Sequence, residues 1–316
     1  MQDKTPTPSN DGSQPAAQLL SDSANVAEML REMASLLDAQ GGNNYRAAAY
    51  RKAADSIAGL NLRDIFESDG LAGLDALPAI GPSIAAAIAE MLTRGRWSRL
   101  DRLRGDAEPE VLFSTIPGVG PELARSLHEN LGVDTLEALE LAACDGRLAL
   151  QVPHIGVRRA AAIRASLTQM LDRNRALRRR PVPAASALEP PVELLLDVDR
   201  EYREGAMAGK LPTIAPRRFN PDGSAWLPVL HNSRADWHFT ALYSNTARAH
   251  QLDRVHDWVI LYCEGQDHVE HQYTVVTPAG GVMAGRRVVR GREAECRDWY
   301  VRSSLPLSKN EPAIKR

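Results

Sequence analysis

The sequence predicts an all-α N-terminal domain followed by a small α+β C-terminal domain. A short pattern of apolar residues, proline and glycine occurs three times before residue 160, and each copy precedes apolar residues at helical spacing. Four of the five Trp and six of the eight His lie after residue 193, together with strand-like runs. We therefore expect a disordered tail (1–22), a helical domain (23–180), a Pro- and Ala-rich linker (181–192), an α+β domain (193–302) and a flexible tail (303–316).

The composition is that of an ordinary globular protein, with 44% hydrophobic and 25% charged residues among 316. The formal net charge of −2 excludes a basic coat over the whole surface but leaves room for a local basic face. The chain has 33 Arg and 5 Lys. Arginine suits forked contacts with phosphate, although a GC-rich genome would produce the same excess. Three widely spaced Cys, no long apolar run and no leader predict a cytoplasmic protein without a membrane partner.

The three copies of the pattern are Leu77–Gly81, Ile116–Gly120 and Val152–Gly156. After each final glycine, an Ala follows at four residues, an aliphatic residue at seven and a Leu at eleven, which is one face of a helix. Pro82 and Pro121 stand where proline suits the first helical turn. Each copy therefore predicts two helices joined by a tight hairpin.

Each predicted hairpin has the chemistry of an anion site. Glycine tolerates a positive φ and leaves the backbone uncovered, and the following helix directs its free N–H groups toward that surface. A nucleic-acid phosphate is the expected anion, and because phosphate carries no base information the binding should not depend on sequence. The candidate residues of the three loops are Ala79 and Gly81, then Gly118, Val119 and Gly120, then His154 and Gly156.

These repeats resemble the helix-hairpin-helix motif, and the wider segment resembles the N-terminal region of family X DNA polymerases. The second resemblance also involves Asn43–Ala54 (NNYRAAAYRKAA), Thr93–Trp97 (TRGRW) and Leu131–Leu139 (LGVDTLEAL), and it covers about residues 24–170. In that family the hairpins contact the DNA backbone, often with a monovalent cation on hairpin carbonyls. The resemblance therefore implies DNA as the partner and Na⁺ or K⁺ as the only cofactor. It places the cation at the carbonyls of Ile116 and Gly118 and adds DNA contacts from Tyr50, Arg51 and Lys52.

The sequence departs from the motif at the first glycine of the hairpin. Gly118 is present in the second copy, whereas Ala79 and His154 replace it in the first and third. The second loop is therefore the best predicted phosphate site. The third loop has two interpretations. It is structural, because His154 is bulky, or His154, Arg158 and Arg159 contact phosphate directly.

Two activities of family X polymerases lack their residues here. The lyase needs a Lys amine on the helix after the first hairpin, and Ala87 stands at the matching position. The polymerase needs a metal-binding Asp pair, but Asp197 and Asp199 are predicted on a solvated helix face, with diverging side chains. The roughly 120 residues that remain are too few for palm and fingers subdomains. An enzyme is therefore the less favoured interpretation.

The C-terminal domain is predicted to hold three or four antiparallel strands, with Trp237–Tyr243, Trp258–Cys263, Tyr273–Val276 and Arg286–Val289 as candidates. Arg286 and Arg287 lie near aromatic residues in the sequence, a combination typical of single-strand binding. A solvated strand edge explains them equally well. A denser basic patch, which includes Arg178, Arg179 and Arg180, closes the helical domain and could follow a phosphate backbone.

Together these features predict a non-enzymatic, sequence-independent DNA-binding protein that supports repair, recombination or replication and associates with the nucleoid. Repair or replication proteins are further expected partners. Two alternatives remain at this point. One is a DNA-processing enzyme, either a nuclease with its site in 193–302 or a residual lyase. The other is a protein adaptor whose hairpins no longer contact DNA.

Overall fold

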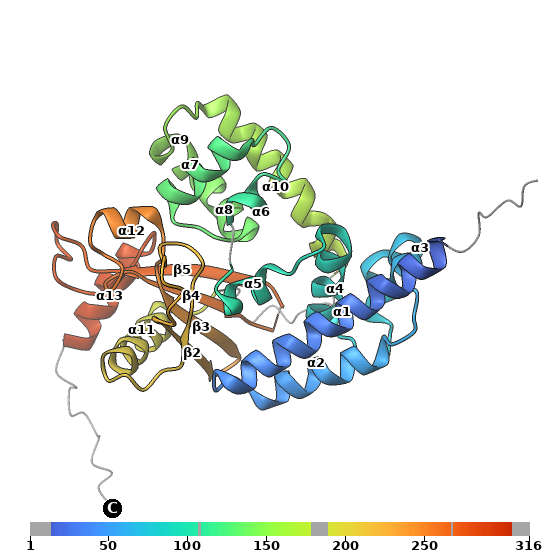
Figure 1. Ribbon diagram of the computed structural model, residues 1–316. Helices are drawn as coiled ribbons and strands as arrows, with labels where there is room; N and C mark the ends of the chain where they lie inside the picture. The colour runs from blue at the N-terminus through green and yellow to red at the C-terminus, as the bar shows by residue number, and fades with distance from the viewer. Residues whose placement is uncertain (1–13, 107–108, 178–188, 267, 305–316) are drawn as a thin grey trace, which may run out of the picture.

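The computed structural model describes residues 14–106, 109–177, 189–266 and 268–304 (Figure 1). Its N-terminal half is helical and its C-terminal half combines an antiparallel sheet with helices, which confirms the predicted fold class. The helices of the first half are α1 (Gln14–Ala39), α2 (Asn44–Ser56), α3 (Leu62–Asp75), α4 (Pro82–Arg94), α5 (Ser98–Arg104), α6 (Pro109–Phe113), α7 (Pro121–Leu131), α8 (Leu136–Cys144), α9 (Arg147–Gln151) and α10 (Val157–Leu177).

The elements after residue 189 form the C-terminal domain. In the part of the chain that the structure describes, the strands make one six-stranded sheet in sequence order, β1 to β6, with each neighbouring pair antiparallel. The helices are α11 (Val192–Met207), α12 (Ala247–Gln251) and α13 (Glu293–Ser304). The strands are β1 (Thr213–Ile214), β2 (Leu227–Arg234), β3 (Trp237–Tyr243), β4 (Val259–Glu264), β5 (Glu270–Val276) and β6 (Val288–Val289).

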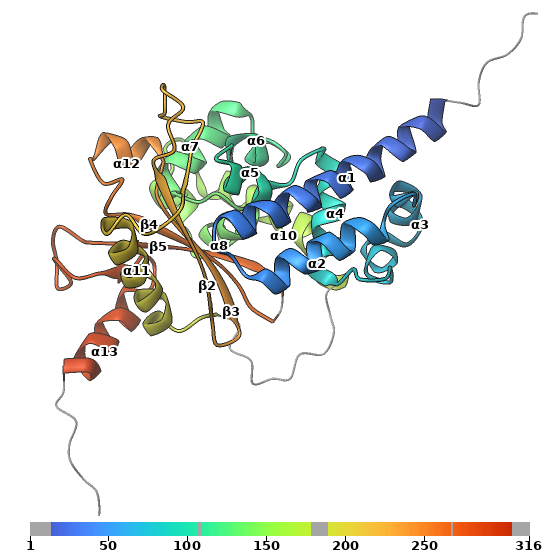
Figure 2. The same cartoon turned by 60° about the horizontal axis from the view of Figure 1, so that its bottom comes forward.

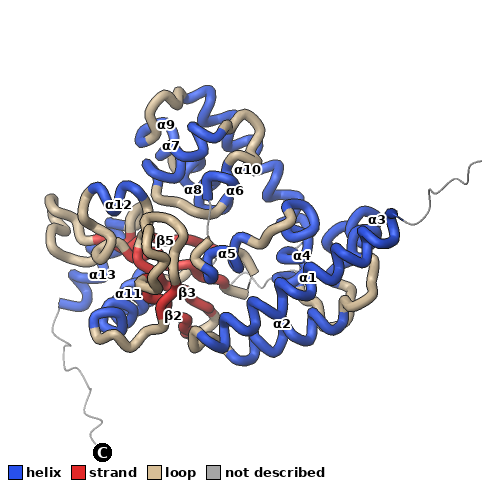
Figure 3. Tube along the Cα trace, viewed as in Figure 1, coloured by secondary structure: helices blue, strands red, loops and turns tan. Residues whose placement is uncertain are grey.

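Buried apolar side chains gather in two separate cores, and the division runs through the helical half. Helices α1–α5, the first helical unit, share one core with the C-terminal domain. Helices α6–α10, the second helical unit, have a core of their own. In Figure 3 the sheet separates two groups of helices. Helices α11 and α13 lie on one side of it, and the helices of the first half lie on the other. The predicted helical domain is therefore two units rather than one.

The two faces of the sheet differ in chemistry. Helices α11 and α13 pack on the apolar face (Figure 2). There the ring of Tyr202, on α11, lies edge-on to Tyr243 at 4.9 Å between centroids, and its hydroxyl donates to the Pro228 carbonyl at 3.0 Å. The other face presents polar residues such as Tyr262 and Gln272, and it meets the helical units. Alternation along each strand puts these two sets on opposite faces.

The strand predictions are largely confirmed. Strand β3 has the predicted bounds, and β5 pairs with β6 with Val275 opposite Val289. Strands β1 and β2 were not predicted. In β2 the sequence LPVLHNSR lacks a clean apolar–polar alternation because both of its faces are covered by protein, one by α11 and one by the first helical unit.

The predicted boundaries of the helical half need one correction. Helix α1 begins at Gln14, so residues 14–22 are helical rather than part of a disordered tail. The segment contains Ala and Leu, which favour helix, and α1 continues through them without a break. The other predicted tail and linker residues, 1–13, 178–188 and 305–316, lie outside the described residues.

The Asp197–Asp199 segment lies on helix α11, as predicted, and its two carboxylates have different partners. Asp197 forms ion pairs with Arg200 and Arg234. Asp199 is fully buried, which corrects the expectation of a solvated face for both. Its carboxylate accepts from Arg287, on which it depends for charge compensation.

Arg287 is therefore a core residue and not part of a DNA-binding edge. Its side chain is only 12% exposed. Besides Asp199, it donates to the Asp257 carboxylate at 2.7 Å and to the Val275 carbonyl at 3.1 Å. These partners accept hydrogen bonds from the N–H groups of the guanidinium. A buried cation is stable only when its donors are satisfied in this way.

We expect Arg287→Met to lower the free energy of unfolding by about 3 kcal/mol, because it leaves Asp199 buried with Arg203 as its remaining cation. Arg286→Met is the matched control. Arg286 is exposed and lies 4.9 Å from the centre of the Tyr300 ring, so its replacement should change stability by at most about 1 kcal/mol. Urea unfolding followed by tryptophan fluorescence measures both. Equal stability of the two variants would contradict the assignment of Arg287 to the core.

Candidate nucleic-acid interface

The three hairpin loops share one backbone conformation, although only the second has glycine at its first position. The φ angles of Ala79, Gly118 and His154 are 60°, 81° and 63°. Each loop is closed by a backbone hydrogen bond of the same kind, from Ile80 to Leu77 at 3.2 Å, from Val119 to Ile116 at 3.0 Å and from Ile155 to Val152 at 3.4 Å. The alanine and histidine replacements therefore leave the loop geometry intact.

The helices after the loops also begin alike. In each, the carbonyl of the last loop glycine accepts the first helical hydrogen bond at 2.9–3.0 Å, at Gly81, Gly120 and Gly156. In α4 and α7 that glycine is the N-cap and offers no side chain to the first N–H groups. Those donors are therefore free for an external acceptor, and the helix dipole favours an anion there.

The middle residue of each loop anchors it to the core. Ile80, Val119 and Ile155 are buried, with Val119 only 4% exposed. The N–H of Val119 is already used within the loop. Val119 therefore does not contact DNA directly, which corrects the prediction made for it. Its role is to hold the neighbouring glycines in place.

The second and third loops lie in the same helical unit and are in contact. Nη2 of Arg159, in the first turn of α10, is 3.5 Å from the carbonyl oxygen of Gly118. Gly118, His154 and Arg158 are exposed. The first loop, with exposed Ala79, belongs to the other core. The structure thus brings two of the three predicted sites together and leaves the first separate.

The NNYRAAAYRKAA segment forms helix α2, and its three predicted contact residues differ in accessibility. Tyr50 is buried, with its ring edge-on to Trp97 at 5.5 Å, so it is a core residue and not a DNA contact. Arg51 forms an ion pair with Asp38. Lys52 is exposed. Among the other predicted basic residues, Arg178, Arg179 and Arg180 lie outside the described residues.

Comparison with known proteins agrees with this geometry. Residues 21–97 match the helix-hairpin-helix domain, and residues 110–168 match the SAM-like helix-hairpin-helix tandem. The helical half is a helix-hairpin-helix region. The DNA polymerase/3'-5' exonuclease PolX of Bacillus subtilis (strain 168) is 28% identical over 116 residues. The matched stretch is 36% of this chain and only 20% of that relative, and it lies in the N-terminal region of this chain.

The helix-hairpin-helix domains imply DNA as the partner, and the resemblance to the N-terminal part of a family X polymerase is confirmed. The first matched segment covers most of the first helical unit, and the second covers most of the second unit and its core. Among the described residues, no group of three or more His, Cys, Asp or Glu is placed to hold a metal ion. No helix within the described ranges is long and apolar enough to span a bilayer.

The monovalent cation implied by the resemblance stays a prediction. Nη2 of Arg159 lies 3.5 Å from the Gly118 carbonyl oxygen, and its positive charge opposes a second cation there. The carbonyl of Ile116 accepts the loop-closing hydrogen bond from Val119 and keeps a second lone pair. We propose that Arg159 supplies the positive charge at this point.

The position that matches the lyase Lys is covered by protein. Ala87, on α4, is buried, and the pocket that it lines also contains the carboxylates of Glu264 and Glu270 from the sheet. These two carboxylates are ion-paired to arginines of the first helical unit. The arginines line the same pocket, so its charges are largely balanced, and burial is what withdraws Ala87 from DNA.

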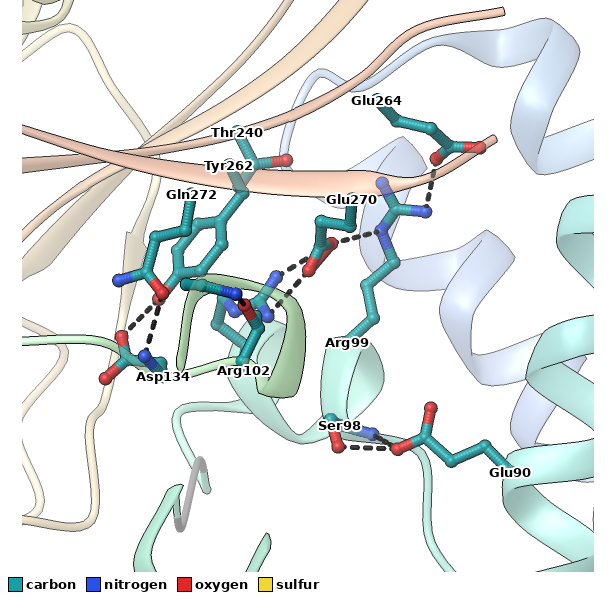
Figure 4. A network of polar contacts seen from close by, with 12 residues as sticks. Glu90, Ser98, Arg99, Arg102, Asp134, Thr240, Tyr262, Glu264, Glu270 and Gln272 are labelled. Atoms are coloured by element: carbon teal, nitrogen blue, oxygen red, sulfur yellow. Dashed lines mark hydrogen bonds and ion pairs between the residues drawn. The ribbon is translucent and has the colours of Figure 1, made fainter. Parts of the chain in front are cut away.

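The interface between α5 and the sheet is a network of ion pairs that sequence reasoning missed (Figure 4). Arg102 binds the Glu270 carboxylate with two nitrogens at 2.9 and 3.1 Å, and it lies 3.5 Å from the centre of the Tyr262 ring. Arg99 donates to Glu264 at 2.7 Å. Burial opposes ionisation of Glu264, but the charge of Arg99 and a hydrogen bond from His268 hold its pKa well below the usual range.

A second polar junction joins α7 to the C-terminal domain. Nε2 of His128 is 2.9 Å from the Asp134 carboxylate, and Nδ1 is 3.4 Å from that of Glu110. Asp134 also accepts from the Tyr262 hydroxyl, and Arg218 pairs with Glu110 at 3.0 Å. Burial alone would lower the pKa of His128, but the two carboxylates overcome it and raise that pKa to about 9.

The charged His128 should make the stability of this junction depend on pH. The folded pKa of about 9 lies above the ordinary value of 6.5, so the stabilisation is full below pH 6.5 and is lost as pH rises through 9. We expect a loss on the order of 3 kcal/mol between pH 6.5 and about 10, measured as a falling Tm. In His128→Gln the decline should be much smaller. An unchanged decline in that variant would assign the effect to other groups.

If Arg159 supplies the positive charge beside the Gly118 carbonyl, as proposed, DNA binding should not need K⁺ or Na⁺. Replacing K⁺ by tetramethylammonium at constant ionic strength should change the Kd for duplex DNA by less than about twofold. Fluorescence anisotropy with a labelled duplex measures this. The Arg159→Ala variant, titrated in both salts, serves as the comparison. A wild-type Kd that rises more than about fivefold without K⁺ would restore the implied cation.

Proposed function

We propose that this chain binds the DNA phosphate backbone without sequence preference, chiefly through the loops 118–120 and 154–156. The observation that carries the proposal is the shared geometry of the loops. A left-handed residue is followed by a helix whose first N–H groups are free in α4 and α7. Such a backbone surface accepts any phosphate and distinguishes no base.

The two loops of the second helical unit are the main site because they act from one rigid body. They share a core, and Arg159 of one contacts the backbone of the other. Exposed arginines lie on the same unit at Arg125, Arg158 and Arg164. With two loops held at a fixed separation, two phosphates are bound at the entropic cost of one association.

A role in supporting DNA repair or replication, at the nucleoid, is the context that we propose for this binding. The relative PolX is named as a DNA polymerase and 3'-5' exonuclease, which is a DNA-processing activity. The present chain matches only part of that protein, so the proposal extends to the DNA contact and not to its reactions. Proteins of repair or replication are the proposed further partners.

The proposal is tested by titrating labelled duplexes of two unrelated sequences, and a single strand of equal length, at several salt concentrations. We expect both duplexes to bind with the same Kd and with a steep, linear fall of log K against log salt. Absence of binding at about 50 mM salt would reject the proposal. A strong preference for one duplex sequence would reject its backbone-only character.

The loop site is tested by Gly120→Asp against Gly120→Asn. Gly120 has a φ of −83°, and an added Cβ would meet no atom within 4 Å, so both side chains fit and both are good N-caps. The two variants differ only in charge. We expect Gly120→Asp to bind duplex DNA at least about tenfold more weakly than Gly120→Asn, because its carboxylate repels phosphate. Equal affinities with an unchanged Tm would exclude the second loop as a phosphate site.

A further inference from the structure

Arg290 lies at the junction between the C-terminal domain and the second helical unit. It follows β6, and its N–H donates to the Thr274 carbonyl at 2.9 Å. Its side chain reaches the far end of α7, where a Cβ added at Gly132 would lie 3.7 Å from Nη1 of Arg290. The relative position of the two units is fixed here, because Gln272 donates to the Gly132 carbonyl at 3.3 Å.

The guanidinium of Arg290 has no carboxylate partner among the described residues, since none lies within 4.0 Å. Its contact is the ring of Trp258, whose centre is 4.6 Å from Cζ. The two nearby carboxylates have other donors. Glu293 accepts from the N–H of Gly291 at 2.9 Å, and Asp257 accepts from Arg287. This distinguishes Arg290 from its neighbours in the basic segment 286–292, where Arg287 and Arg292 form ion pairs.

The side chain of Arg290 is half-buried, so part of it remains open to solvent. Burial lowers its pKa, because the charged form loses hydration. The carbonyls at the end of α7 offset at most about 1 kcal/mol of this cost. A bound anion would offset more of it.

We propose that Arg290 binds a phosphate of the DNA backbone, so that the C-terminal domain takes part in DNA binding. The proposal rests on the proposed function of the hairpins. Helix α7 connects the two sites, with Gly120 before its first residue and Gly132 after its last. Its eleven residues span about 16 Å, which is roughly five nucleotides of duplex along the axis. One duplex can therefore reach both sites.

The ring of Trp258 gives this site a defined geometry. A guanidinium stacked on an aromatic ring keeps its edge N–H groups free and its plane fixed, which suits forked contact with phosphate oxygens. Arg290 is half-buried and has no carboxylate partner among the described residues, so an incoming phosphate displaces no ion pair of Arg290.

The test compares full-length Arg290→Gln with wild type in duplex titrations at several salt concentrations. We expect the variant to bind about three- to tenfold more weakly at low salt, and the slope of log K against log salt to fall by about 1. Arg290→Lys keeps the charge and should keep the slope. Arg297→Gln is the matched control, because Arg297 is exposed on α13, and it should bind as wild type.

An unchanged affinity and slope in Arg290→Gln, with wild type binding DNA, would overturn this proposal and leave the hairpin function standing. A lower Tm with the wild-type slope would show that Arg290 only stabilises the junction, and it would overturn the proposal as well. Inorganic phosphate, added at constant ionic strength, is a competitor in the same titration. If it weakens DNA binding equally in wild type and in Gly120→Asp, the site at Arg290 takes free phosphate instead of DNA. Failure of wild type to bind any duplex would reject the hairpin function itself.

Discussion

The contact between helix α5 and the sheet determines how the other parts are arranged. Arg99 and Arg102 are withdrawn from water there, and each is stable only with a carboxylate that it can reach. Glu264 and Glu270 meet this need from the polar face of the sheet. The same face continues to Gln272, whose side chain binds the backbone of the second helical unit. One polar surface therefore joins both helical units to the C-terminal domain and fixes their relative positions.

The hairpins were predictable from the sequence because all of their determinants are local. Each hairpin is specified by five consecutive positions. A proline precedes the turn, an aliphatic residue lies within it and a glycine ends it. Ala79 and His154 show that the first glycine of the motif is not essential for the loop. In the structure both residues adopt the left-handed conformation, at a cost of about 1 kcal/mol each. Burial of Ile80 and Ile155 beside them offsets that cost, so the whole pattern, and not one glycine, sets the loop.

The contacts between units were not predictable, because their partners are far apart in the chain. Arg102 and Glu270 are separated by 168 residues, and Arg287 and Asp199 by 88. Nothing in the local sequence says that Arg287 points into the core while Arg286, its neighbour, points to solvent. For Tyr50 the sequence offers a tyrosine directly before two basic residues, which fits a DNA contact as well as a core position. Only the fold decides between them.

The near-neutral net charge gains a physical meaning from these contacts. Many of the arginines are matched to carboxylates inside or between the units, so they contribute little field to the surroundings. The hairpin loops attract phosphate through backbone N–H groups, whose partial charges do not enter the count of ionised residues. Affinity for DNA therefore depends on backbone donors and on the few guanidinium groups left without a carboxylate. Arg290 is such a group, and its position against α7 is a consequence of the same polar interface that neutralises the others.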